Sequence, residues 1–152
     1  MNTQDFTTTL VVDRTPKQVF EAVNNVRGWW TEDIEGLTNE AGDLFTVRFG
    51  TTWKTFAILE MIPDKKIVWQ VIDCWLPWNE NKTEWKDTVV VWEISATKGS
   101  TQLRFTHLGL LPEHACFDAC SNAWAGYLNQ SLRRLIENGE GEPHRNTQKA
   151  MV

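Results

Sequence analysis

A succession of strand-like segments followed by one long amphipathic helix constrains the fold of this chain more than any other feature of its sequence. Apolar residues recur at three- and four-residue steps from Phe117 to Leu135, which predicts a helix over about 113–137. Ahead of this helix, alternating apolar residues separated by tight turns predict an antiparallel meander. The predicted strands cover residues 6–12, 44–49, 54–62, 67–74, 88–96 and 101–108.

A short helix is expected directly after the first strand. Thr15 stands at the N-cap position and Pro16 at the first helical position, where its missing N–H costs nothing. Val19 and Val23 follow at helical spacing, so this helix is predicted over about 16–25. The order of elements is therefore strand, short helix, five further strands and long helix.

This order predicts an α+β fold of the helix-grip type. A long amphipathic helix after an antiparallel meander must bury its apolar stripe against one face of the sheet, so a curved sheet is expected to wrap around the C-terminal helix. The helix should contact the curved sheet closely at one end and separate from it at the other. An apolar cavity between the sheet and the helix is therefore expected. One domain over residues 1–139 and a flexible tail over 140–152 are expected. The residues expected in the core include Leu10, Phe20, Leu128 and Leu135.

The composition excludes several classes of protein. Apolar residues make up 41% of the 152 residues, which is too many for a disordered chain. The net charge is −5 and the sequence has no run of Lys or Arg, so binding to nucleic acid is not expected. No apolar run approaches the roughly 20 residues of a membrane helix, so no membrane span is expected. The N-terminus lacks the features of a signal peptide. Three cysteines without framework spacing favour a reducing compartment, so a cytoplasmic location is expected.

Short segments spread over most of the chain occur in an order that is typical of one fold. They are Thr15–Pro16 with Phe20, Val26–Trp30, Glu35–Gly36 with Gly42–Asp43, Phe105–Leu110, Trp124–Leu128 with Ser131–Leu132, and Gly139–Pro143. In these segments the chain resembles the SRPBCC superfamily of START-like, helix-grip domains, and within it the branch of activators of heat-shock-protein ATPase. The resemblance implies a helix-grip domain with a hydrophobic pocket, in a superfamily that includes lipid carriers, polyketide cyclases and chaperone regulators.

His107 is the polar residue that most suggests a site. It ends a row of inward-facing residues with Leu103 and Phe105 on the last predicted strand. There it could orient a ligand oxygen or act as a general base near neutral pH. Alternatively, it is a structural histidine at the edge of the core, bonded to a backbone carbonyl. The residues predicted to line a ligand pocket are Phe45, Val47, Phe56, Ile58, Trp69, Val71, Trp92, Leu103, Phe105, His107, Phe117, Cys120, Trp124 and Tyr127.

Glu60 and Asp73 are the other candidates for catalysis. By strand alternation, Glu60 shares a face with Phe56, and Asp73 shares a face with Trp69. If either carboxyl group points inward, burial should raise its pKa and make it a candidate acid or base. Otherwise each is a residue near a strand end that faces solvent.

The cysteines raise the question of a metal site. Cys116 and Cys120 are four residues apart on the predicted helix, with His114 close by, so the thiols share one helix face. No second pair of ligands stands at a suitable spacing, and buried cysteine usually behaves as a small hydrophobic residue. Phosphate-binding glycine loops and the signatures of activated nucleophiles are also absent. Neither a metal nor a cofactor is therefore expected.

Tryptophan is unusually frequent, with nine Trp beside seven Phe and a single Tyr. Its large ring and N–H suit sites with one apolar side and one polar edge, such as pocket walls and interfaces, although a core built from large side chains explains the count equally. The loop from Trp75 to Trp85 also contains Trp78. Three roles are open for this loop: a lid over the pocket, a docking surface for a protein partner, or a segment folded back onto the sheet rim.

Three functions remain from these observations. The first is non-enzymatic binding of a hydrophobic or aromatic small molecule between the sheet and the C-terminal helix. The second is an enzyme of the polyketide cyclase, hydrolase or dehydratase type, with His107 and an inward carboxylate as proton carriers. The third is a chaperone-type regulator that binds a protein through exposed tryptophans.

Overall fold

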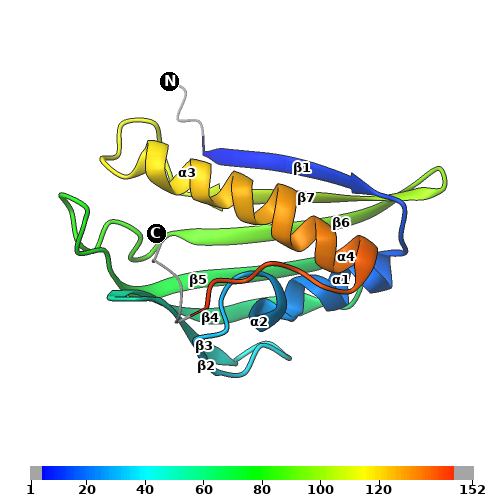
Figure 1. Cartoon of the computed structure of the whole chain (residues 1–152), viewed down its shortest axis with the longest axis horizontal. Helices are drawn as coiled ribbons and strands as arrows, with labels where there is room; N and C mark the ends of the chain where they lie inside the picture. The colour runs from blue at the N-terminus through cyan, green and yellow to red at the C-terminus, as the bar shows by residue number, and fades with distance from the viewer. Residues whose placement is uncertain (1–4, 146–152) are drawn as a thin grey trace.

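A computed structural model of the chain describes residues 5–145. A curved seven-stranded sheet lies along one side of a long C-terminal helix (Figure 1), so the predicted α+β helix-grip fold is confirmed. The order across the sheet is β1-β7-β6-β5-β4-β3-β2, and every neighbouring pair is antiparallel. The strands are β1 (Phe6–Val12), β2 (Ile34–Gly36), β3 (Leu44–Phe49), β4 (Thr52–Ile62), β5 (Lys66–Trp75), β6 (Val89–Thr97) and β7 (Ser100–Leu108).

Helices occur after the first strand and at the end of the chain. The last three helical segments form one continuous helix, because the residues at both junctions keep right-handed helical geometry. This C-terminal helix begins at Phe117 instead of near residue 113, because the preceding residues form turns. The helices are α1 (Pro16–Asn24), α2 (Val26–Trp29), α3 (Phe117–Gly126), the π-helix η1 (Tyr127–Leu132) and α4 (Arg133–Asn138). Among residues 5–145, none of these is long and apolar enough to cross a membrane.

The start of α1 follows the sequence prediction. Thr15 Oγ1 accepts a hydrogen bond from the Gln18 amide at 3.1 Å, and Gln18 Oε1 accepts one from the Thr15 amide at 2.9 Å. This reciprocal capping box satisfies two backbone donors that the first helical turn leaves without partners. Pro16 occupies the first helical turn, as its fixed φ favours.

The π-helix shifts the buried face of the C-terminal helix. Wider turns in η1 advance the apolar stripe by about one residue relative to an α-helix. Leu128 is 1% exposed, as expected, but Ile136 takes the buried position that the sequence predicted for Leu135. Leu135 and Phe20 only pack against the core as partly buried residues. The apolar periodicity therefore predicted the helix correctly and its last turn in the wrong phase.

Residues 140–145 lie against the body of the protein, whereas the sequence predicted that the flexible tail begins at residue 140. The Glu142 amide donates to Ser131 Oγ at 2.7 Å, and the His144 amide donates to the backbone oxygen of Trp30 at 2.9 Å. These contacts involve backbone groups, so a segment with little apolar content is still held in place.

Gly141 allows this close approach. A Cβ atom there would lie 2.4 Å from the backbone oxygen of Gly28 and 2.9 Å from that of Ser131. A side chain at this position would therefore push the segment away from α2 and the C-terminal helix. The remaining part of the predicted tail, residues 146–152, lies outside the described residues.

Candidate functional site

The interior of the grip contains all the residues predicted to line a ligand pocket. Twelve of the fourteen are buried, whereas Phe117 and Tyr127 are partly buried and pack against the same core. They come from β3, β4, β5, β6, β7 and the C-terminal helix. The sequence therefore identified a set of residues that the fold brings together.

Trp30, which follows α2, fills much of the space between sheet and helix. Its ring stacks on Trp124 of the C-terminal helix, with centroids 4.8 Å apart, and on Trp69 of the sheet at 6.3 Å. It also contacts Phe49 at 5.6 Å and Phe56 at 5.7 Å. With 3% of its surface exposed, Trp30 belongs to the core itself. The centre of the grip is thus a layer of packed rings.

His107 is held in this interior by a chain of side-chain hydrogen bonds. Trp124 Nε1 donates to His107 Nδ1 at 3.1 Å, so Nδ1 carries no proton. The proton is on Nε2, which donates to Thr88 Oγ1 at 2.8 Å. Thr88 in turn donates to the backbone oxygen of Trp85 at 2.6 Å. This series of hydrogen bonds connects the C-terminal helix to β7 and to the loop before β6.

This environment makes His107 a structural residue. It is fully buried, and desolvation, followed by the nearby positive charges of Lys54 and His114, lowers its pKa to about 3. Both ring nitrogens already have partners, so neither is free to take a proton from a ligand at neutral pH. The structural interpretation of His107 therefore fits, with side-chain partners in place of a backbone carbonyl.

Lys54 on β4 is the one charged side chain buried in the core of the described residues. It is 1% exposed, and its Nζ lies 4.4 Å from the ring centroid of Trp85, 4.8 Å from Phe49 and 5.8 Å from Trp30. No carboxylate of residues 5–145 forms an ion pair with it within 4.0 Å. Desolvation lowers the pKa of Lys54 to about 8, partly offset by the neighbouring thiols.

Strand alternation contains a signal for Lys54 that the sequence interpretation missed. Lys54 lies two residues before Phe56 and four before Ile58, both of which were assigned to the inner face. All three are buried in the structure. A lysine in such a row is expected at the sheet end or in solvent, because a buried ammonium group is rare. Lys54 is an exception to that rule.

A groove of about 450 Å³ lies between the C-terminal helix and the segment that follows it. We call it the helix groove. One wall is made by α3 and η1, and the other by residues 142–145, which Gly141 and Ser131 hold in place. Tyr127 projects from the helix wall, and burial raises its pKa to about 12. The lining residues are Asn122, Ala123, Gly126, Tyr127, Gln130, Ser131, Glu142, Pro143, His144 and Arg145.

Phe49 contacts residues of the helix groove and also Lys54. Its ring centroid is 6.1 Å from that of Tyr127 and 5.4 Å from that of His144, and both of these residues line the groove. The same ring lies 4.8 Å from Lys54 Nζ. A single buried aromatic side chain therefore contacts both the groove wall and the buried cation.

A family model described as "Activator of Hsp90 ATPase homolog 1-like protein" matches residues 13–137. The chain belongs to this family. The resemblance inferred from the sequence segments is thereby confirmed. Among curated proteins, no sequence matches the chain.

Several solved structures share the fold of this chain. The Aha1 dimer from Colwellia psychrerythraea is 24% identical with a TM-score of 0.76, over 91% of this chain and 99% of that chain. A protein from Mesorhizobium loti is 15% identical with a TM-score of 0.69, over 89% and 99% of the two chains. DynU16, from the dynemicin biosynthetic locus, is 16% identical with a TM-score of 0.67, over 89% of this chain and 48% of that chain. At these identities the likeness establishes the fold alone.

Glu60 and Asp73 lie outside the interior of the grip. Register shifts interrupt the pairing of β4 with β5 near both residues, and each shift reverses the alternation expected from a regular strand. Glu60 forms an ion pair with Lys66 at 3.4 Å, with 45% of its side chain exposed. Asp73 is exposed, and Cys74 takes the buried position next to it. The condition for catalysis, an inward carboxylate, is not met at either residue.

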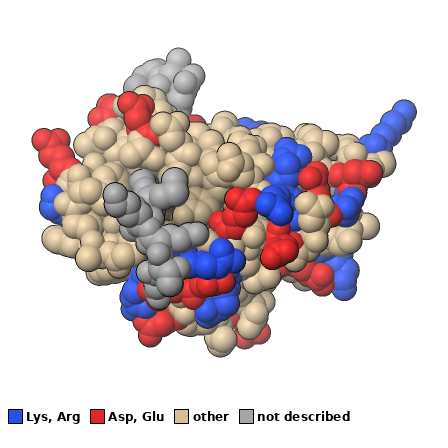
Figure 2. All heavy atoms as spheres, viewed as in Figure 1, with Lys and Arg blue, Asp and Glu red and all other residues tan. Residues whose placement is uncertain are grey.

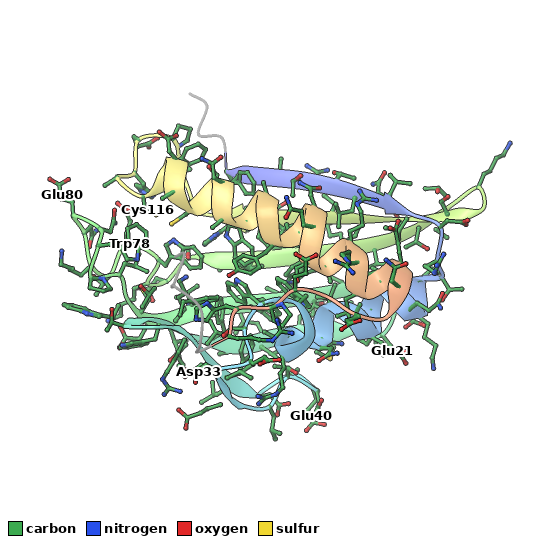
Figure 3. The ribbon with its side chains drawn as sticks, in the orientation of Figure 1. Glu21, Asp33, Glu40, Trp78, Glu80 and Cys116 are labelled. Carbon is green, nitrogen blue, oxygen red and sulfur yellow. The ribbon has the colours of Figure 1, made fainter. Side chains whose placement is uncertain are left out.

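The loop from Trp75 to Trp85 folds back onto the rim of the sheet. Trp85 is 3% exposed and its Nε1 donates to Cys120 Sγ at 3.3 Å. Glu84 accepts a hydrogen bond from the Cys116 amide at 2.9 Å, ahead of α3. Desolvation opposes ionisation of Glu84, but this hydrogen bond and that from the Asn79 side chain lower its pKa. Figure 3 shows the tip of the loop, with Trp78 and Glu80, at the same end of the fold as Cys116.

The three thiols are buried, and each of them raises the pKa of Lys54. A hydrogen bond between Cys116 and Cys120 raises the pKa of Cys116 and lowers that of Cys120. Within residues 5–145, no group of three or more His, Cys, Asp or Glu side chains is placed to hold a metal ion.

Acidic and basic side chains lie intermingled on the face shown in Figure 2, so this face has no continuous basic surface.

Proposed function

We propose that the protein binds an aromatic or hydrophobic small molecule in the helix groove. The observation that carries this proposal is the groove itself. Its volume of about 450 Å³ falls within the roughly 300–1,000 Å³ typical of small-molecule sites. Apolar surface from Ala123, Tyr127 and Pro143 would hold the ligand, and the side-chain amide of Gln130 would orient it.

The backbone of the groove wall supports this assignment. The π-helix η1 supplies part of the wall, and π-helical turns inside α-helices occur frequently at functional sites. Immediately before it, Gly126 leaves open space where other residues would place a side chain. Glycine in a helix costs about 1 kcal/mol relative to alanine, so its presence on this wall fits a requirement for space.

The packed interior then serves as the floor of the site. Trp30 occupies the centre of the grip, so we place the ligand in the helix groove and the predicted lining residues one layer behind it. Tyr127 belongs to both sets, because it lines the groove and contacts Phe49 of the interior. A ligand larger than the groove would have to displace Phe49 to reach the interior.

Two substitutions of Gly126 test the proposal. Gly126 has φ −63° and ψ −50°, so any residue fits its backbone geometry. Gly126→Ala should raise the free energy of unfolding by about 0.5–1 kcal/mol and leave ligand affinity nearly unchanged. Gly126→Phe should fill the groove and weaken binding of naphthalene-2-carboxamide by more than about tenfold, measured by isothermal titration calorimetry.

The alanine variant is the matched control, because it changes the same backbone position without filling the groove. Equal affinity of the wild type and Gly126→Phe for the probe would contradict the proposed site. If the wild type binds neither naphthalene-2-carboxamide nor naphthalene-2-carboxylate, the function itself is contradicted.

Binding to a protein is the second candidate function, and it is favoured by the exposed tryptophans. Trp75 and Trp78 each expose 42% of their surface at the end of the sheet. Tryptophan is enriched at the energetic centres of protein interfaces, and the family is named after an activator of the Hsp90 ATPase. The two functions use separate surfaces, so a Trp78→Ser variant should keep the naphthalene affinity of the wild type.

The enzymatic alternative has less support from the structure. Its proton carriers were His107 and an inward carboxylate, but His107 has partners on both nitrogens. Glu60 is partly exposed in an ion pair with Lys66, and Asp73 is exposed. A general base must reach the proton that it removes, and none of these three groups faces the helix groove.

A further inference from the structure

We infer that the ligand of the helix groove carries a carboxylate, which pairs with the buried ammonium group of Lys54. This inference rests on the proposed function and names the chemical class of its ligand. Its basis is a cation that the folded chain encloses without a carboxylate: Lys54 is 1% exposed and forms no ion pair with a carboxylate of residues 5–145.

The surroundings of Lys54 hold a cation but do not neutralise it. The faces of Trp85 and Phe49 attract the ammonium group through their ring electrons. Removing it from water still disfavours the charged form, as the lowered pKa of about 8 shows. A carboxylate brought in by a ligand would supply the missing charge in a region of low dielectric, where such pairs are strong.

The rest of the interior is also short of hydrogen-bond acceptors. Trp69 Nε1 and Trp92 Nε1 are buried and have no hydrogen-bond partner within the described part of the chain. Unpaired buried donors are uncommon in folded proteins. The ring of Trp30 contacts both residues: its centroid is 5.8 Å from Lys54 Nζ and 6.3 Å from the ring centroid of Trp69. An interior with spare donors and a spare cation suits a ligand that brings oxygen acceptors.

Phe49 contacts both the groove residues and the buried cation. Its ring contacts Tyr127 and His144 of the groove and Lys54 behind them. For a carboxylate attached to a planar ring to reach Lys54 while the ring stays against Tyr127, the buried side chain of Phe49 would have to move. The ligand class is therefore an aromatic carboxylate.

Arg145 is the competing cation, because it lines the groove directly. Its Nε lies 3.3 Å from Glu32 Oε2, so it already has an anionic partner. Lys54 has no carboxylate partner, and a buried charge without one gains more from an added carboxylate than a charge that is already paired. The two residues give separate predictions, which the experiment below distinguishes.

The test compares a matched pair of probes on wild type, Lys54→Met and Arg145→Gln. Naphthalene-2-carboxylate and naphthalene-2-carboxamide have the same ring and nearly the same shape, but only the first is charged. In wild type the carboxylate should bind roughly ten- to a hundredfold more tightly, as a charged hydrogen bond predicts. The ratio should fall to about one in Lys54→Met and stay within about threefold of the wild-type ratio in Arg145→Gln.

The outcomes separate the inference from the function on which it rests. Equal affinity for the two probes in wild type, or a ratio that depends on Arg145 and not on Lys54, overturns the inference and leaves the groove intact. Loss of binding of both probes in wild type overturns the inference together with the proposed function. Methionine matches the length and apolar stem of lysine, so Lys54→Met keeps the shape of the core.

A second measurement needs no variant. At pH 8, roughly half of Lys54 is protonated, and pairing with a carboxylate should draw protons from the buffer. Titrations in two buffers of different ionisation enthalpy should show proton uptake for the carboxylate and none for the carboxamide. The absence of proton uptake overturns the inference.

Other titratable groups also interact with Lys54: Cys74 of β5, Cys116 and Cys120 at the start of the C-terminal helix, and His107 of β7. A Cys120→Ser variant removes the thiol with the lowered pKa, so it isolates the contribution of that group to proton uptake.

Discussion

Replacing Trp30 with alanine should lower the free energy of unfolding by about 3–5 kcal/mol, the range for removing a large buried aromatic side chain. The cost follows from the central position of the ring, which is 3% exposed and contacts both the sheet and the helix. Urea denaturation at pH 7, followed by circular dichroism, measures the change. The rings that would lose contact are those of Trp29, Phe49, Phe56, Trp69 and Trp124.

Trp78→Ala is the matched control for this substitution. Trp78 exposes 42% of its surface, and its main polar contact is a hydrogen bond from Nε1 to Thr52 Oγ1 at 2.9 Å. Its replacement should cost no more than about 1 kcal/mol. If Trp30→Ala costs as little as this control, the centre of the grip is not a packed layer and the ligand site returns to the interior.

Acidification should remove stability through His107, on the order of 4–5 kcal/mol between pH 6.5 and pH 3. The folded-state pKa of His107 is about 3, whereas an unperturbed histidine titrates near 6.5. Between these two pH values, His107 is protonated in the unfolded chain but not in the folded one. The free energy of unfolding therefore rises with pH in this range and decreases as the pH falls. Above pH 6.5 this contribution is complete.

His107→Gln isolates the contribution, because an amide can accept from Trp124 and donate to Thr88 without titrating. Other groups also respond to acid, including His144 and Glu84, whose pKa values are lowered. The quantity to compare is therefore the difference in the free energy of unfolding between the wild type and the variant, measured at each pH. The wild-type slope should exceed that of the variant by about 1.4 kcal/mol per pH unit between pH 6 and pH 4. Parallel slopes would show that His107 is accessible to protons in the folded protein.

The architecture was predictable because the hydrophobic periodicity of the sequence determines which segments form strands and which form the long helix. Alternation in the strands and the apolar stripe from Phe117 to Leu135 each continue over enough residues to outweigh local exceptions. The capping box at Thr15 was equally visible in the sequence, since it depends on residues three positions apart. Such local chemistry depends little on tertiary context.

Irregularities within regular elements were not predictable from the same pattern. The π-helix advances the stripe so that Ile136 is buried in place of Leu135, and the register shifts of β4 and β5 turn Glu60 and Asp73 outward. Each depends on one extra residue in a turn or ladder, which leaves no signature in a single sequence.

The site itself was predicted only in part. Aromatic composition and strand alternation identified the interior, and with it Tyr127. Two features were missed for different physical reasons. Lys54 was overlooked because charged residues are seldom buried, and the groove wall at residues 142–145 was overlooked because backbone contacts through Ser131 hold it in place of apolar side chains.

The most direct test of ligand binding in the helix groove is the map of backbone amide shifts during titration with naphthalene-2-carboxylate, recorded by ¹⁵N–¹H correlation spectroscopy. The proposed function predicts that saturable shifts concentrate on Ala123, Gly126, Tyr127, Gln130 and residues 142–145, with smaller effects around Phe49. Shifts confined to the loop around Trp75 and Trp78, or no saturable shifts at all, would contradict it.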